Sequence, residues 1–223
     1  MTTTTEATDI RTCTVGVLGG TGEQGRGLAR RFATAGLTVL IGSRDERRAR
    51  EAAASAGPGV EGLTNDEVAR RCDLVIVAVP WSGHFDTLAS LREALSGRVV
   101  VDCVNPLGFD AQGAHALAVD EGSAAQQAAA LLPESTVVAA FHHLSAVRLL
   151  DDSVRDLDSD VLVLGDDRAA TDLVASLAEV LPGVRGIYAG RLRNAHQVEA
   201  LTANLISVNR RYKAHAGVRI TDV

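Results

Sequence analysis

The sequence predicts an α/β fold: a Rossmann-type, doubly wound, mostly parallel sheet with a small C-terminal helical portion. Short apolar runs with strand character alternate with helix-like segments along most of the chain. Hydrophobic residues make up 46% of the 223 residues and aromatic residues only 3%, which is typical of an aliphatic core around a buried parallel sheet. We expect a flexible tail over residues 1–12, a Rossmann domain over 13–190 and a C-terminal helix within 191–223.

Strands and helices alternate regularly in the first half of the chain. The last apolar run there is almost uninterrupted, which indicates a strand buried on both faces. Asn65 is expected to be the N-cap of one short helix. The expected strands are 14–18, 38–41, 60–63 and 73–79, and the other expected helices are 23–35, 45–56 and 82–95.

The same alternation continues in the second half. The segment 105–108, with its Asn-Pro pair and glycine, is expected to be a turn. The expected strands are 98–104, 136–141, 161–164 and 184–189, and the expected helices are 123–132 and 169–181.

The final segment predicts one long helix, starting near Asn194 and stopping near Gly217. Its apolar residues recur at spacings of 3, 4, 3 and 4, which gives one continuous stripe. A helix of this length, on the order of 33 Å, must pack along its own domain or against a second subunit. The stripe consists of Val198, Leu201, Leu205, Val208 and Tyr212.

Composition argues against several classes of protein. The net charge of −6 gives no overall basic footprint for nucleic acid. No apolar run approaches the roughly 20 residues that span a bilayer, and residues 1–9 do not read as a signal peptide. The three cysteines, Cys13, Cys72 and Cys103, match no metal spacing and are expected to be reduced and structural. We therefore expect a cytoplasmic protein that binds small molecules.

A glycine motif follows the first strand directly. In a Rossmann turn, Gly20 would make the tight turn, Gly22 would let the backbone approach a pyrophosphate, and Gly25 would let helix and strand pack closely. An ordinary strand–helix turn is the alternative. The G-x-G-x-x-G run consists of Gly20, Thr21, Gly22, Glu23, Gln24 and Gly25.

The end of the second strand predicts NADP rather than NAD. NAD enzymes usually place a carboxylate there, and a carboxylate would repel a 2′-phosphate. This chain has Ser43 and Arg44 instead, with Arg47 and Arg48 in the next turn. Hydroxyl and guanidinium groups suit a phosphate. The alternative is a solvated basic helix.

Later strand ends carry further candidate residues. Pro80 follows the fourth strand and Asn105 the fifth, at the edge where open α/β sheets bind ligands. His142 and His143 follow the sixth strand and suit proton handling or hydrogen bonding. They lack a third ligand at metal spacing, so no metal site is expected. Alternatively, both histidines merely hydrogen-bond to backbone.

From Thr14 onward the chain resembles the NADPH-dependent reductases of coenzyme F420, or F420H2:NADP+ oxidoreductases. This resemblance implies direct hydride transfer between nicotinamide C4 and deazaflavin C5, in either direction. The archaeal members differ by having threonine and isoleucine at positions 143 and 144 and a neutral residue at 23. The resemblance rests on segments 18–22, 42–44, 80–81, the loop at 142, and segments 165–167, 189–190 and 199–202.

The resemblance also implies site residues. His142 would orient the deazaflavin or stabilise charge near its ring, and the terminal helix would help form this pocket and a homodimer. The deazaflavin side would consist of His142, His143, Leu144 and Ser145. The NADP site would consist of Thr21, Gly22, Glu23, Gln24, Ser43, Arg44 and Arg48, with Pro80, Asn105 and Ala146 toward the nicotinamide.

Two other functions remain open from the sequence. An NADPH-dependent imine or ketone reductase would have a similar fold and would need a proton donor, which His142 or His143 could supply. A non-catalytic NADP(H)-sensing protein would bind the nucleotide and a protein partner without chemistry.

Overall fold

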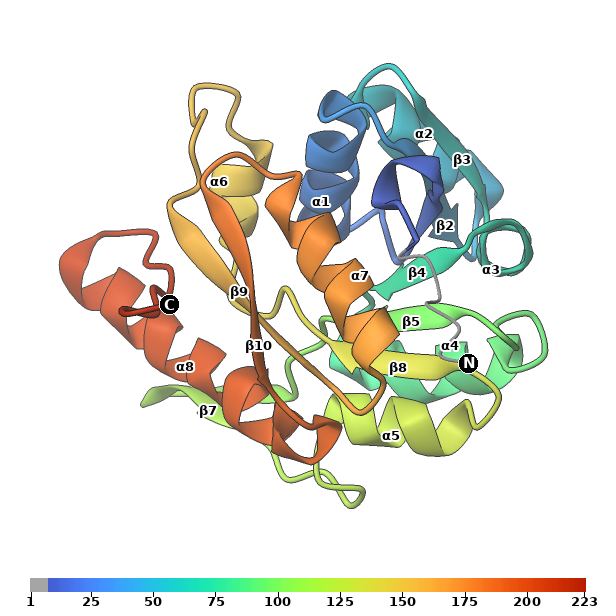
Figure 1. Cartoon of the computed structure of the whole chain (residues 1–223). Helices are drawn as coiled ribbons and strands as arrows, with labels where there is room; N and C mark the ends of the chain where they lie inside the picture. The colour runs from blue at the N-terminus through green and yellow to red at the C-terminus, as the bar shows by residue number, and fades with distance from the viewer. Residues whose placement is uncertain (1–7) are drawn as a thin grey trace, which may run out of the picture.

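The computed structural model describes residues 8–223 and contains one eight-stranded sheet in the order β10-β9-β8-β5-β4-β1-β2-β3. Figure 1 shows helices on both faces of this sheet. Neighbouring strands pair in parallel except β8 and β9, which are antiparallel. The strands are β1 (Thr14–Leu18), β2 (Thr38–Ser43), β3 (Val60–Thr64), β4 (Leu74–Val77), β5 (Val99–Asp102), β8 (Thr136–Ala139), β9 (Ser159–Gly165) and β10 (Val184–Gly190).

Two apolar layers, one on each face of the sheet, hold the helices in place. Helices α1, α2, α6 and α7 contribute to one layer; α3, α4, α5 and the start of α8 contribute to the other. The predicted doubly wound α/β fold is therefore confirmed. The helices are α1 (Glu23–Thr34), α2 (Glu46–Ala56), α3 (Asn65–Arg71), α4 (His84–Leu91), α5 (Ala124–Leu131), α6 (Ala146–Leu150), α7 (Arg168–Glu179) and α8 (Ala195–Tyr212).

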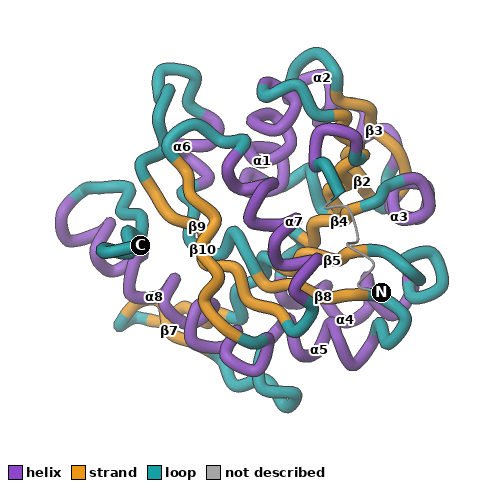
Figure 2. The backbone as a smooth tube through the Cα atoms, in the orientation of Figure 1, coloured by secondary structure: helices purple, strands orange, loops and turns teal. Residues whose placement is uncertain are grey.

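The chain direction along the sheet reverses between β1 and β4. Strands β1, β2 and β3 run outward in sequence order, and the chain then returns to place β4 on the other side of β1. Ligands of open α/β sheets bind at the carboxyl edge beside such a reversal. Figure 2 shows the loops that follow the strands. The loops after β1 and β4 are thus the expected location of a site.

Several predicted local structures were wrong. Asn65 is the first residue of α3, and the cap is Thr64, whose hydroxyl accepts from the Glu67 N–H while the Glu67 carboxylate accepts from the Thr64 N–H. The expected turn at 105–108 instead leads into an antiparallel hairpin of β6 (Leu107–Asp110) and β7 (Gly113–Ala116). The helix expected over 82–95 is shorter, since a 3-10 turn (Trp81–Gly83) precedes α4.

Both ends of the described chain also differ from expectation. Of the expected tail, residues 1–7 lie outside the described residues, but Ile10–Thr12 forms a 3-10 turn with Ile10 buried in the core. Helix α8 ends at Tyr212, well before Gly217, because Lys213 adopts a left-handed conformation. The chain then turns back, and the Asp160 N–H donates to the Val218 carbonyl at 2.7 Å. The final segment therefore pairs with β9.

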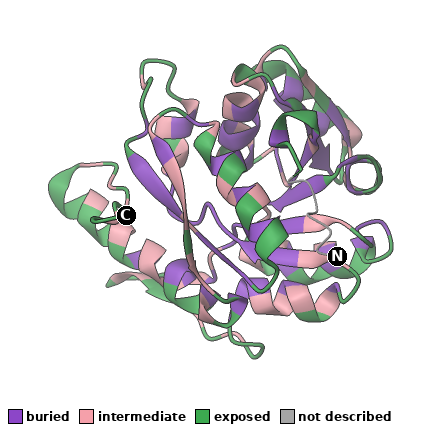
Figure 3. Ribbon diagram, in the orientation of Figure 1, coloured by how far each residue is buried: buried purple, intermediate pink, exposed green. Residues whose placement is uncertain are grey.

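Helix α8 lies beside the hairpin strand β7 and extends away from the sheet (Figure 1). Much of its surface is half-buried or exposed (Figure 3). All three cysteines are free and buried, as expected of structural thiols. Among residues 8–223 no helix meets the length and hydropathy needed to cross a membrane.

Candidate functional site

The glycine turn after β1 is built by close backbone packing. Gly19 has φ +72°, and a Cβ there would lie 2.8 Å from the Ala78 carbonyl oxygen, so the tight turn falls on Gly19 rather than Gly20. A Cβ on Gly20 would lie 2.7 Å from Ile41 Cγ2. On Gly25 it would lie 2.9 Å from the Gly20 Cα, which fits the close packing predicted there.

Gly22 differs from the other glycines of the motif because space remains around it. The nearest atom to a Cβ on Gly22 would be the Gly19 carbonyl oxygen, at 3.6 Å. Gly22 is also the N-cap of α1, and among residues 8–223 no side chain caps this helix or helices α4 and α8, whereas side chains cap α2, α3, α5, α6 and α7. The N–H groups of the first turn of α1 are therefore available to an anion.

Positive charge is concentrated directly after β2. Ser43 is buried, and its hydroxyl accepts from the Asp45 N–H at 3.2 Å. Arg44, Arg47 and Arg48 are exposed, and within residues 8–223 none of the three forms an ion pair. The neighbouring carboxylate, Asp45, accepts from the N–H groups of Arg47 and Arg48 as the cap of α2. These guanidinium groups are thus free to meet a phosphate.

The turn after β8 contains a strained residue. Phe141 is fully buried with φ +63°, which is uncommon for a bulky side chain and costs of order 1–3 kcal/mol. Its ring packs edge-on against Phe32 of α1, with centroids 5.9 Å apart. The side-chain amide of Gln24, also on α1, donates to the Phe141 carbonyl at 3.2 Å. The nucleotide-side helix therefore helps to hold this turn.

The next carbonyl of the turn is held from two other elements. Asn105, after β5, donates its amide N–H to the His142 carbonyl at 2.9 Å. Thr202 of α8 donates its hydroxyl to the same oxygen at 3.2 Å. The structure therefore brings together four segments that the sequence analysis singled out: the glycine loop, the β5 end, the His142 turn and the terminal helix.

The His142 ring lies inside the protein, only 3% exposed, and within the described part of the chain neither ring nitrogen makes a hydrogen bond of normal geometry. Burial lowers the pKa of His142 to about 4, so the ring is neutral near pH 7. The side-chain oxygen of Asn105 is also buried and has no hydrogen-bond partner among residues 8–223. Near neutral pH His142 is therefore a neutral imidazole with one N–H, not an imidazolium acid.

The three residues that follow His142 use their polar groups internally. His143 is buried, and its Nε2 donates to the Asp160 carbonyl at 2.7 Å, which directs the ring toward β9. Burial also lowers the pKa of His143. Leu144 is buried, and the Ser145 hydroxyl caps α6, which begins at Ala146. This helix was not expected from the sequence.

A buried polar cluster near this site was missed in the sequence. His84, at the start of α4, places Nε2 2.7 Å from an Asp102 carboxylate oxygen and Nδ1 2.9 Å from the Gln127 side-chain oxygen. Glu199 of α8 accepts from the Ala124 and Ala125 N–H groups at 2.9 and 3.1 Å. Burial raises the pKa of Glu199 to about 7. The only sequence signal was a polar residue, Asp102, ending a continuous apolar strand.

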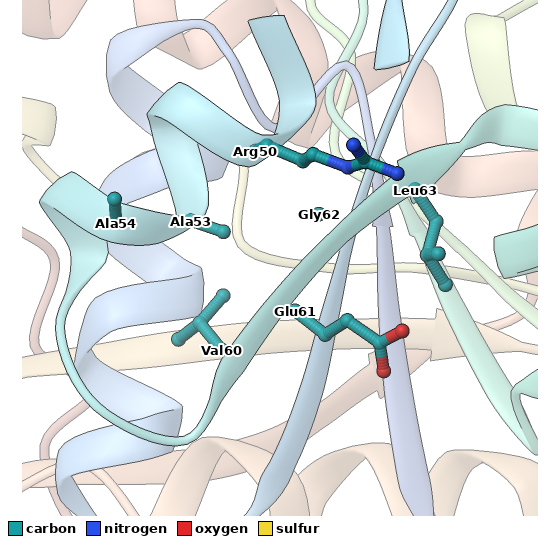
Figure 4. A pocket seen from close by; sticks show the side chains of 7 residues that line it. All are labelled: Arg50, Ala53, Ala54, Val60, Glu61, Gly62 and Leu63. Atoms are coloured by element: carbon teal, nitrogen blue, oxygen red, sulfur yellow. The ribbon is translucent and has the colours of Figure 1, made fainter. Parts of the chain in front are cut away.

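An open groove of about 370 Å³ lies elsewhere, between α2 and β3 (Figure 4). It follows the outer strand of the sheet and includes no predicted site residue, and we assign it no function. Its lining residues are Arg50, Ala53, Ala54, Val60, Glu61, Gly62 and Leu63. Pro80, by contrast, is exposed after β4, beside the reversal of chain direction.

Known proteins resemble the chain over nearly its full length. Residues 14–106 match the family model described as "NADP oxidoreductase coenzyme F420-dependent". The F420-dependent NADP reductase of Methanothermobacter thermautotrophicus is 42% identical over 94% of this chain and 95% of its own length. That of Methanocaldococcus jannaschii is 37% identical over 94% of this chain and 98% of its own.

A solved structure resembles the chain equally broadly. A crystal structure from an Arthrobacter species, described as an F420-dependent NADP reductase, superposes with a TM-score of 0.81. The two chains are 28% identical, and the superposition covers 98% of that chain and 93% of this one. On sequence similarity over almost the whole length, the protein belongs to the family of F420-dependent NADP reductases.

Proposed function

We propose that the protein transfers a hydride reversibly between NADP(H) and coenzyme F420. The 42% identity to a reductase of this name, over 94% of the chain, is the observation that carries the proposal. The geometry is compatible with it, because two features follow adjacent strands at the carboxyl edge: the N-terminus of α1 and three exposed arginines. Within residues 8–223 no side chain caps this helix and none of the three arginines forms an ion pair. A helix N-terminus suits the pyrophosphate of a dinucleotide, and guanidinium groups suit its 2′-phosphate.

On this proposal, NADP(H) lies over the glycine loop. The pyrophosphate contacts the start of α1, where Gly22 leaves room, and the 2′-phosphate contacts Ser43, Arg44 and Arg48. The nicotinamide extends toward the ends of β4 and β5. The remaining assigned contacts are Gly20, Thr21, Glu23, Gln24, Gly25, Pro80, Asn105 and Ala146.

The deazaflavin side lies between the turn at 141–145 and α8. The two cofactors supply the hydride chemistry, and the protein must hold donor and acceptor carbons roughly 3–3.5 Å apart. A neutral, buried His142 fits a role in shaping this side of the site rather than in donating a proton. His143 and Leu144 support the same turn from inside the protein, and Ser145 caps the helix that follows it.

A homodimer and a cytoplasmic location complete the proposal. The outer half of α8 exposes Val208 and Tyr212, and Phe109 of the neighbouring hairpin is 70% exposed. A second copy of the chain would cover this apolar surface. Free, buried cysteines suit a reducing compartment. Sedimentation of the purified protein tests the dimer.

The experiment that tests the function follows the visible absorbance band of oxidised F420 after addition of NADPH or NADH. Bleaching with NADPH, and little with NADH, supports the proposed reaction and the contacts at Arg44. Turnover of an imine or ketone without any F420 reaction would favour the alternative reductase. Nucleotide binding without turnover of any acceptor would favour the sensing protein.

A further inference from the structure

The buried cluster of His84, Asp102, Gln127 and Glu199 has no role in the function proposed above. His84 and Asp102 are both fully buried, and Glu199 is 2% exposed. The cluster joins α4, α5, α8 and the end of β5 near the carboxyl edge of the sheet. We refer to these four residues as the His84 cluster.

The hydrogen bonds determine where the protons of the cluster lie. The Gln127 amide nitrogen donates to Glu121 at 3.2 Å, so the Gln127 oxygen must face His84 Nδ1. Nδ1 therefore carries a proton. Nε2 faces the Asp102 carboxylate at 2.7 Å and donates to it. With both ring nitrogens protonated, His84 is an imidazolium paired with a carboxylate.

The charge of His84 is consistent with its surroundings. Burial opposes the charged ring, but the hydrogen bond and charge of Asp102 and the bond to Gln127 outweigh it, so the pKa of His84 is raised. Glu199 on α8 adds a favourable negative charge, and the Trp81 ring lies 5.4 Å from the imidazole. The neutral His142 also lies within the field of Asp102.

A continuous series of bonds connects this pair to the His142 turn. The second carboxylate oxygen of Asp102 accepts from the Val104 N–H at 2.9 Å, which fixes the backbone just after β5. Cys103 donates its N–H to the Val77 carbonyl at 3.2 Å. Asn105 then donates to the His142 carbonyl. The position of the Asp102 side chain therefore constrains the backbone up to Asn105 and, through Asn105, the turn at His142.

Stability alone is a weak reason for such a pair. A buried ion pair loses its hydration on folding, and apolar residues of similar size often stabilise a protein as well or better. A buried pair does fix geometry, because its hydrogen bonds tolerate little displacement. Its position beside the segment that holds His142 makes geometry the relevant property.

We propose that His84 and Asp102 are positioning residues, which hold the segment after β5, and through Asn105 the His142 turn, in the geometry needed for hydride transfer. This inference rests on the proposed function for its kinetic consequences. The structural link from Asp102 to His142 is independent of which substrate is used.

The first test detects the structural connection between Asp102 and His142 and needs no substrate. In protein with ¹⁵N-labelled histidine rings, His84 of the parent is expected to show two protonated nitrogens at pH 7. In Asp102→Asn the amide can donate to Nε2 and still accept from Val104, so His84 becomes neutral while the geometry persists. The His142 ring signals should shift strongly in Asp102→Ala and much less in Asp102→Asn, where only the charge of Asp102 is lost. Unchanged His142 signals in Asp102→Ala would overturn the proposal.

The second test is kinetic. A displaced turn is expected to lower kcat of Asp102→Ala by about ten- to a hundredfold. The affinity for NADPH should fall by less than kcat, because Asn105 is one of several assigned nucleotide contacts, and Asp102→Asn should recover most of both losses. Equal kcat losses in both variants, or a loss confined to NADPH binding, would overturn positioning by hydrogen bonds. The matched control is Asp73→Ala, which removes a carboxylate bonded to the Thr14 N–H at the opposite edge and should leave kcat unchanged.

Two further results separate a failure of the positioning role from a failure of folding and from a failure of the proposed function. If Asp102→Ala does not fold, the double variant His84→Leu/Asp102→Leu removes the pair without leaving a buried charge and should show the same kcat loss. If the parent does not react with F420 but the His142 signals respond as expected, the proposed function fails while the structural link stands.

Discussion

Alanine substitutions at Gly22 and Gly25 should separate the binding role of the glycine loop from its structural role. A Cβ on Gly22 meets only the Gly19 carbonyl oxygen, at 3.6 Å, and Gly22 has φ −77°, which alanine adopts readily. Because alanine is a poorer N-cap than glycine, Gly22→Ala should lower the free energy of unfolding by no more than about 1 kcal/mol. The new methyl group would stand where the pyrophosphate must approach, so we expect NADPH affinity to fall at least about tenfold, or 1.4 kcal/mol.

Gly25→Ala should give the opposite result in the free protein. Its Cβ would lie 2.9 Å from the Gly20 Cα and 3.1 Å from the Gly19 carbonyl oxygen, and backbone atoms cannot move aside cheaply. Overpacking of this kind costs typically about 1–3 kcal/mol. For a chain of this length that lowers Tm by about 2–4 °C for each kcal/mol.

Thermal unfolding without ligand and titration with NADPH measure the two effects separately. The prediction is a Tm close to that of the parent with weak NADPH binding for Gly22→Ala, and a clearly lower Tm for Gly25→Ala. If Gly22→Ala binds NADPH as the parent does, or loses as much stability as Gly25→Ala, the assignment of this loop to the pyrophosphate is refuted.

Three further predictions concern charge. Arg44→Ala should weaken NADPH binding about tenfold or more, because a charge-assisted hydrogen bond is worth about 1.5–3 kcal/mol. The same variant should bind NADH as the parent does. Equal affinity of parent and variant for NADPH would contradict the 2′-phosphate site. Hydrogen bonds from Arg185, the Ile220 N–H and Arg219 lower the pKa of Asp160. The ionised carboxylate therefore stabilises the folded protein above the pKa that Asp160 has in the unfolded chain, and this stabilisation is lost as pH falls below that value. Urea unfolding should show a smaller acid-induced loss of stability in Asp160→Asn than in the parent. Burial raises the pKa of Glu199 from 4.5 to about 7, so between these pH values the folded state binds a proton that the unfolded state has lost, and stability declines as pH rises. Glu199→Gln should flatten this part of the plot of unfolding free energy against pH. An unchanged slope would contradict the raised pKa of Glu199.

The sequence predicted the sheet well because the central strands, such as β4 and β5, are nearly continuous apolar runs. The run at 73–79, for example, contains β4, the strand next to β1. The hairpin at 107–116 was not predicted, since its two strands have only four residues each and include two glycines. Helix α6 has only five residues, too few for a periodic pattern.

The candidate site was only partly accessible from the sequence. Motif residues such as Gly22 and Arg44 could be found because their chemistry depends on local spacing. The pairing of His84 with Asp102 joins residues 18 positions apart on different elements, so no local pattern reveals it. The left-handed conformation of Phe141 is equally invisible, because phenylalanine gives no signal of positive φ.

The strained turn at Phe141 also has a thermodynamic consequence. Gln24 donates to one of its carbonyls from the nucleotide-binding helix, and Thr202 donates to the next carbonyl from α8. A nucleotide that draws Gln24 toward its phosphates would loosen one side of the turn and thereby alter the affinity of whatever binds beside α8. Reciprocity then requires that the second ligand change nucleotide affinity by the same factor. Each cofactor would thus act as a heterotropic effector of the other, through a single turn of the backbone.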